Sequence, residues 1–198
     1  GSAFGGIFLW SFFPEMAMPL LIGSVIIAFI LSLVAYFKPK ASPIIAPLYA
    51  IFEGVFLGII SFMVSQLYNG LVTQAILITV IVFGLMLALY MFRIIKVTKK
   101  FRSVMSVAIM SIMAIYAVSW ILRMFHIDIP YIHGSGMIGI GFSLFVIGIA
   151  SFSLLLNFDT IERGAQMGSP KYMEWLSAMG LMITLVWLYL EILKLLMK

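Results

Sequence analysis

Residues 136–158 read GMIGIGFSLFVIGIASFSLLLNF, and residues 175–196 read WLSAMGLMITLVWLYLEILKLL. The first stretch contains no charged side chain, and the second contains only Glu191 and Lys194. A helix of about 20 apolar residues is long enough to span the hydrocarbon core of a bilayer. Both stretches are therefore predicted to be transmembrane helices, and they decide the class of the whole protein.

The rest of the chain has a similar composition. Of its 198 residues, 64% are hydrophobic and only 10% are charged, and the mean hydropathy is +1.22. Soluble domains average about 45–50% apolar and 25% charged residues, so most of these side chains must face lipid or one another. We expect residues 1–198 to form a single all-α integral membrane domain. The absence of cysteine from the sequence excludes disulfides and thiolate metal sites.

Seven membrane spans are expected. Five apolar stretches precede the two quoted above, at residues 1–13, 18–37, 44–67, 71–92 and 103–122. The first is short and resembles the second half of a helix, so we expect its N-terminal part to be missing. Turn signals separate the later spans, as at Lys38-Pro39-Lys40 and Asn69-Gly70. The predicted architecture is a seven-transmembrane-helix bundle.

Basic residues are distributed unevenly between alternate loops. One side has Arg123, Lys194 and Lys198, and the other collects nine Lys and Arg residues. These nine are Lys38, Lys40, Arg93, Lys96, Lys99, Lys100, Arg102, Arg163 and Lys171. Because cytoplasmic loops carry the excess of basic residues, we place the Arg93–Arg102 loop in the cytoplasm. The basic residues behind the net charge of +5 are thus expected to orient the protein in the membrane, and they do not indicate nucleic-acid binding.

Two carboxylates in the last spans are the strongest functional candidates. Glu191 lies inside the last span, and Asp159 ends the apolar run of the span before it. A carboxylate costs about 2.5–3.5 kcal/mol at the centre of a membrane helix, so it is retained where it is compensated or useful. Simpler readings are that Glu191 pairs with Lys194 one turn away and that Asp159 is an ordinary residue of the membrane edge.

A third carboxylate, Glu53, lies in the middle of the span at 44–67. It is next to Gly54, and Gly54 and Gly58 have the spacing that lets another helix approach closely. Glu53 is therefore expected to point into the bundle, either on an ion path or in a structural hydrogen bond. His126 and His133 supply too few ligands for a metal site. We find no nucleophile–base arrangement, and we expect neither enzymatic activity nor a cofactor.

Several of these segments resemble the Bax inhibitor (transmembrane Bax-inhibitor-motif) family, and its bacterial branch most closely. They are Tyr49–Gly58, Tyr90–Arg102, Phe158-Asp159 and Glu174–Leu196. The resemblance implies a seven-helix bundle with the last helix at its centre, and a pH-sensitive calcium leak in a bacterial inner membrane. It also implies a gate made of two acids, one on each of the last two helices. The matching positions are Asp159 and Glu191, with Glu in place of the usual second Asp.

The chemistry of such a pair can be derived without the resemblance. Two carboxyl groups within hydrogen-bonding distance do not both ionise cheaply, so one of them retains a proton. Ionised carboxylate oxygens suit a hard cation such as Ca²⁺. The hypothesis is that rising pH opens a cation path lined by Asp159, Glu191 and Glu53. Asp159 and Glu191 would be transient Ca²⁺ ligands, and Arg93 or another cytoplasmic basic residue would latch the closed state.

Two other functions fit the same residues. A proton-coupled secondary transporter would use the acids as a proton relay. A non-transporting regulator would bind a membrane protease or another membrane protein through the face that carries Gly54 and Gly58. The expected partners are the lipid bilayer, Ca²⁺ and protons, together with a membrane protein in the last case.

Overall fold

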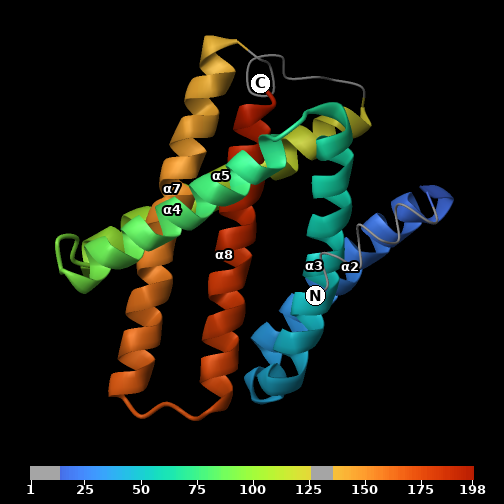
Figure 1. Ribbon diagram of the computed structural model, residues 1–198. Coiled ribbons are helices and arrows are strands. Elements are labelled where there is room, and N and C mark those ends of the chain that lie inside the picture. The colour runs from blue at the N-terminus through green and yellow to red at the C-terminus, as the bar shows by residue number, and fades with distance from the viewer. Residues whose placement is uncertain (1–13, 126–135) are drawn as a thin grey trace. The chain divides into compact units, whose positions relative to one another are not determined.

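The computed structural model describes residues 14–125 and 136–198, and the regular structure within these two ranges is helical (Figure 1). Six of its helices are long and apolar enough to cross a membrane. They are α2 (Pro14–Phe37), α3 (Ser42–Leu67), α4 (Leu71–Met91), α5 (Lys99–Met124), α7 (Met137–Gln166) and α8 (Tyr172–Leu196). A short 3-10 helix, η1 (Pro39–Ala41), joins α2 to α3. The chain is thus an all-α, multi-pass membrane protein.

Six of the seven expected spans lie within the described residues, and each coincides with one of these helices. The expected first span at residues 1–13 and the two histidines at 126 and 133 lie outside the described residues. The turn predicted at Asn69-Gly70 is confirmed, because Gly70 has a φ of +83° between α3 and α4. Gly168 has a φ of +63° between α7 and α8, a left-handed conformation that glycine adopts without a steric penalty.

Most of these helices extend beyond the apolar runs that predicted them, and the extensions of α5 and α7 bear on the candidate site. α5 begins at Lys99 and not at Ser103, because the Thr98 hydroxyl accepts a hydrogen bond from the Phe101 backbone N–H at 3.1 Å and caps the helix. α7 continues about two turns past Phe158, to Gln166. Arg102 therefore lies in the first turn of a helix, and Asp159 lies inside a helix and not at its end.

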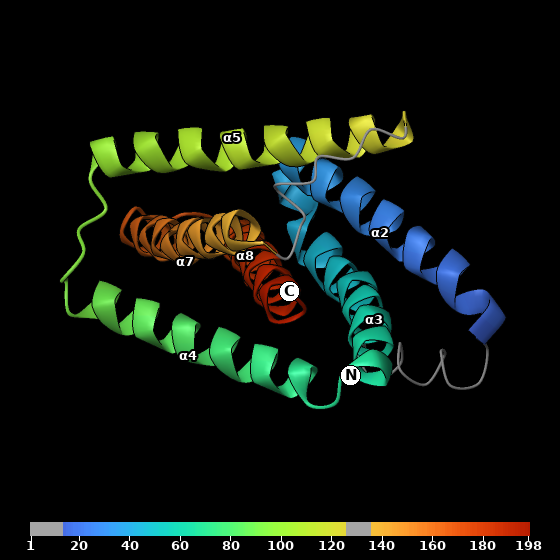
Figure 2. The same ribbon diagram turned by 90° about the horizontal axis from the view of Figure 1, so that it is seen from above.

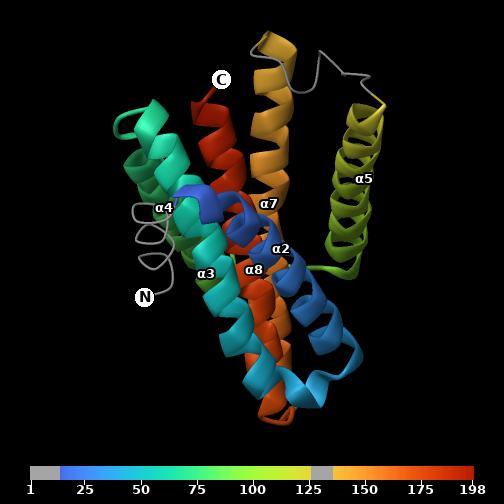
Figure 3. The same ribbon diagram turned by 90° about the vertical axis from the view of Figure 1, so that its right-hand side faces the viewer.

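The described chain forms two compact units. The first unit contains the chain up to Thr73 together with Thr160–Val186. In it, α2 packs against α3, and Met179 of α8 joins their core (Figure 3). Small side chains at this contact allow the helix backbones to approach closely. The buried residues of the core are Ala28, Ala35, Ile45, Ala46, Tyr49 and Met179.

The second unit contains Gln74–Asp159 and Trp187–Lys198. In this unit α7 lies between α4 and α5 (Figure 2). Aromatic rings fill both contacts of α7, with ring centroids 5.7–6.4 Å apart, the usual separation for edge-to-face pairs. The four pairs are Phe83–Phe158, Tyr90–Phe158, Phe101–Phe152 and Tyr116–Phe142. The second unit also contains Asp159 and Glu191.

Candidate functional site

Asp159 is a buried carboxylate of α7 that forms an ion pair with Arg102 of α5. Only 8% of the Asp159 surface is exposed, and its Oδ2 atom accepts a hydrogen bond from Arg102 Nη2. The Arg102 side chain is 44% exposed, so the carboxylate is the more deeply buried partner. Burial of Asp159 is compensated by this charge-assisted bond, which links the first turn of α5 to the C-terminal third of α7.

The basic residue that contacts Asp159 bears on the latch of the sequence hypothesis. That hypothesis names Arg93, or another cytoplasmic basic residue, as the latch of the closed state. Arg93 lies in the connection between α4 and α5 with a φ of +53°, and its backbone N–H donates to the Tyr90 carbonyl. The structure instead places Arg102 against Asp159.

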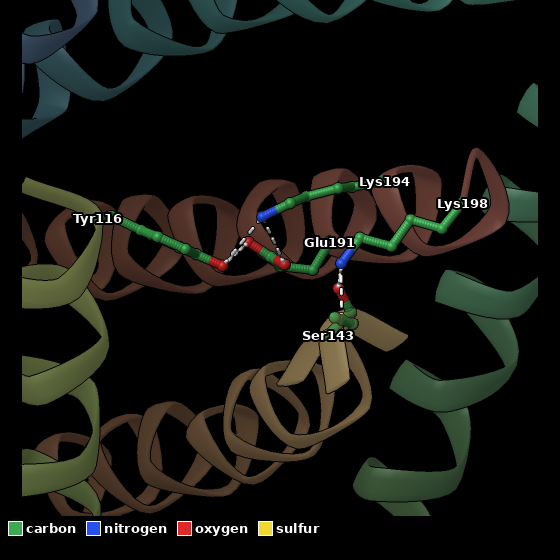
Figure 4. Close-up of polar contacts among 6 residues, drawn as sticks. Tyr116, Ser143, Glu191, Lys194 and Lys198 are labelled. Carbon is green, nitrogen blue, oxygen red and sulfur yellow. Dashed lines mark hydrogen bonds and ion pairs between the residues drawn. The ribbon is translucent and has the colours of Figure 1, made fainter. Parts of the chain in front are cut away.

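Glu191 is a buried carboxylate of α8 that contacts Tyr116 and Lys194 (Figure 4). Only 5% of its surface is exposed, and its Oε1 atom accepts a hydrogen bond of 2.6 Å from the Tyr116 hydroxyl. Lys194 Nζ lies 3.9 Å from Oε2, 3.5 Å from the Tyr116 hydroxyl and 4.8 Å from the centre of the Tyr116 ring. The pairing of Glu191 with Lys194, which the sequence left as an alternative, is therefore present.

The structure does not pair Asp159 with Glu191, although both belong to the second unit. Their partners Arg102 and Tyr116 lie fourteen residues apart on α5, which corresponds to about 21 Å along the helix axis. The same spacing is close to four turns, so the two partners lie on the same face of α5. Each acid is bound to its own position on α5, and a proton shared between the two acids is not part of this arrangement.

A second lysine of the C-terminal segment is inserted among oxygen atoms of α7. Lys198 Nζ donates hydrogen bonds to the Gly139 carbonyl at 2.6 Å and to the Ser143 hydroxyl at 3.0 Å (Figure 4). Burial lowers the pKa of Lys198, and repulsion from Lys194 lowers it further, whereas Glu191 acts in the opposite direction. The end of α8 therefore directs two ammonium groups into the second unit.

Glu53 belongs to the first unit, whereas Asp159 and Glu191 belong to the second. It is half-buried on α3, and its side chain interacts with that of Tyr49, one turn earlier on the same helix. A structural role for Glu53 and a place on an ion path both remain compatible with this position. Among residues 14–125 and 136–198, no group of three or more His, Asp or Glu side chains could hold a metal ion.

Sequence reasoning identified the buried acids but not all of their partners. In the sequence, Arg102 is one of several charges of a loop, and Tyr116 lies within a predicted apolar span. The available signal was the spacing of these two residues, an arginine and a tyrosine about four turns apart on one helix face. Ser143 is one of three serines in residues 136–158, and nothing in the sequence distinguishes it from the other two.

One comparison with known proteins agrees with the family resemblance. A family model described as Bax inhibitor 1 like matches residues 2–198. Comparisons with curated proteins and with solved structures found no match. The matched range includes both acids, their partners on α5 and the lysines at the end of α8. The chain therefore belongs to the Bax inhibitor 1 like family.

Proposed function

We propose that this protein is a pH-sensitive cation leak channel that conducts Ca²⁺, with Asp159 and Glu191 on the ion path. The observation that carries the proposal is the Arg102–Asp159 ion pair between two membrane helices. Intramembrane ionisable residues that pair with each other commonly mark ion pathways. Membership of the Bax inhibitor 1 like family supports the proposal at the level of the whole chain.

The ion pair suggests how the leak is closed. Carboxylate oxygens are preferred ligands of Ca²⁺, and the Arg102 guanidinium occupies this position at Asp159. A permeating Ca²⁺ has to displace Arg102 before it contacts Asp159. A proton competes for the same oxygens and removes the negative charge that would stabilise the ion. Flux is therefore expected to rise with pH, and Arg102 takes the latch role that the sequence suggested for Arg93.

In this scheme the acids are successive positions on the path and not a pair. Their partners on α5 are about 21 Å apart, which is a large part of a hydrocarbon core of about 30 Å. Two carboxylates at this separation would divide a long apolar barrier into shorter steps. Glu53 is proposed as a further contributor from the first unit.

The proposal also includes a cellular setting. The excess of basic residues on one side of the spans supports a cytoplasmic Arg93–Arg102 loop in a bacterial inner membrane. The Arg102–Asp159 pair would then lie toward the cytoplasmic end of α5. The contact of Glu191 with Tyr116 would lie toward the opposite end.

The test is Ca²⁺ uptake into proteoliposomes between about pH 6 and pH 8. We expect uptake by the wild type to rise with pH. Asp159→Asn should lower the flux and flatten its pH profile, whereas Arg102→Gln should raise the flux at every pH. Ser106→Ala, an exposed change one turn further along α5, is the matched control.

The outcomes separate the three functions. Equal flux through the wild type and Asp159→Asn across the pH range would refute the gate. Flux that needs a proton gradient and saturates with an organic solute would identify a proton-coupled transporter. No flux in any variant, together with a co-purifying membrane protein, would identify a non-transporting regulator.

A further inference from the structure

One oxygen of Glu191 is satisfied and the other is not. Oε1 accepts the Tyr116 hydroxyl at 2.6 Å, whereas Oε2 is buried and has no hydrogen-bond partner within the described part of the chain. A buried carboxylate oxygen without a donor has lost its water and carries an uncompensated desolvation cost. Such an oxygen indicates a position where a cation is held by charge and not by a directed hydrogen bond.

The ammonium group of Lys194 occupies that position. Its Nζ atom is 3.9 Å from Oε2, which is an ion-pair distance but beyond the range of about 2.7–3.2 Å for hydrogen bonds to oxygen. The same atom is 3.5 Å from the Tyr116 hydroxyl and 4.8 Å from the centre of its ring. A carboxylate, a phenol oxygen and a ring face all attract cations in general and do not select an ammonium group.

Lys194 is also able to leave this position. Its side chain is 30% exposed, whereas the Glu191 side chain is 6% exposed. Its contact with Glu191 is made between residues three apart on α8, so only the lysine side chain has to rotate to empty the position. One turn later, Lys198 places its ammonium group between a carbonyl and a hydroxyl oxygen of α7 in the same manner.

We infer that Lys194 is a tethered cation that fills a cation-binding position made by Glu191 and Tyr116, and that it excludes metal ions until it moves away. The inference rests on the proposed function, because there Glu191 lies on the ion path. In this inference Lys194 blocks Glu191 from metal ions, as Arg102 blocks Asp159 in the proposed function. A charge-conserving substitution should keep the position filled, and a neutral substitution should open it to a metal cation.

The test uses Tb³⁺, a luminescent probe for Ca²⁺ sites, with the full chain in nanodiscs of uncharged phosphatidylcholine. An Asp159→Asn background removes the other acid that the second unit contains among the described residues. Adding Lys194→Gln should strengthen Tb³⁺ binding by about tenfold or more, because a like charge about 4 Å away is removed. Lys194→Arg should leave binding weak. Adding Glu191→Gln to the Lys194→Gln protein should abolish the gain in Tb³⁺ affinity. This variant also measures the Tb³⁺ bound by exposed acids, so that this background can be subtracted.

Equal Tb³⁺ affinity with and without Lys194→Gln would overturn the inference, and so would a gain that survives Glu191→Gln. Lys194→Met provides a second neutral variant with the same expectation if Lys194→Gln is not monodisperse by size-exclusion chromatography. Ca²⁺ flux separates this inference from the proposed function. A Tb³⁺ gain without flux in any variant would keep the tethered cation and refute the channel. Flux that rises with pH, without a gain in Tb³⁺ affinity, would support the channel and refute the tethered cation.

Discussion

At the scale of single residues, the hydroxyl of Tyr116 links α5 to α8 in the second unit. It donates a hydrogen bond of 2.6 Å to Glu191 and lies 3.5 Å from Lys194 Nζ. Hydrogen bonds between membrane helices average about 0.6 kcal/mol and reach about 1.7 kcal/mol. Bonds to charged groups are the stronger ones. The Tyr116 bond should therefore contribute near the upper end of this range.

We predict that Tyr116→Phe lowers the free energy of unfolding by about 1–2 kcal/mol, because it leaves both oxygens of Glu191 without a donor. Reversible unfolding in mixed micelles measures this difference. Tyr36→Phe is the matched control, because Tyr36 is 77% exposed on α2 and should tolerate the same change. A Tyr116→Phe protein as stable as the Tyr36→Phe protein would contradict the assigned bond.

At the scale of helices, the cap at the start of α5 places Arg102 opposite Asp159. Thr98 accepts the Phe101 N–H, and this bond fixes the first turn, which includes Arg102. Substitution of a capping Ser or Thr by Ala typically costs about 0.5–2 kcal/mol. The effect of losing this cap should extend to the ion pair, since fraying of the first turn withdraws Arg102 from Asp159.

We predict that Thr98→Ala destabilises the protein by about 1 kcal/mol and raises Ca²⁺ flux in the same direction as Arg102→Gln, but to a smaller extent. Thr98→Ser keeps the capping oxygen and should behave as the wild type in both measurements. If Thr98→Ala and Thr98→Ser conduct equally and unfold at the same denaturant concentration, the cap does not position Arg102.

The helices also show what the sequence could and could not predict. Apolar run length located six spans, because burial in lipid requires continuous hydrophobicity. Apolar run length predicted too late a start for α5 and too early an end for α7, because capping and side-chain pairs extend helices beyond the apolar run. Asp159 and Glu191 could be identified because placing a carboxylate in a membrane helix costs free energy. Arg102 was not recognised as a partner of Asp159, because they are 57 residues apart and only tertiary packing brings them together.

At the scale of the whole molecule, large apolar side chains are exposed on every described membrane helix, as with Phe29 of α2, Val80 of α4 and Met137 of α7. In water such a surface would drive aggregation, whereas in a bilayer it contacts acyl chains. Basic residues are concentrated between alternate helices, which is the distribution that fixes the orientation of a membrane protein.

We predict opposite accessibility for two single-cysteine variants on either side of α4. The chain contains no cysteine, so Asn69→Cys and Lys100→Cys each introduce one thiol, and both positions are exposed. A membrane-impermeant maleimide should label Asn69→Cys in intact cells and Lys100→Cys only after permeabilisation. The reverse pattern would place the Arg93–Arg102 loop outside the cell.

The continuity of α5 between Arg102 and Tyr116 has a mechanical consequence. A helix of this length behaves nearly as a stiff rod. Asp159 and Glu191 therefore both contact one rigid element, α5. A tilt of α5 that pulls its first turn away from α7 also strains the Tyr116 contact further along. If losing the Arg102 contact weakens the Tyr116 contact by some coupling free energy, then losing the Tyr116 contact weakens the Arg102 contact by the same amount. Loss of the Arg102 contact is therefore expected to weaken the Tyr116 contact, although the two acids are too far apart for strong direct repulsion.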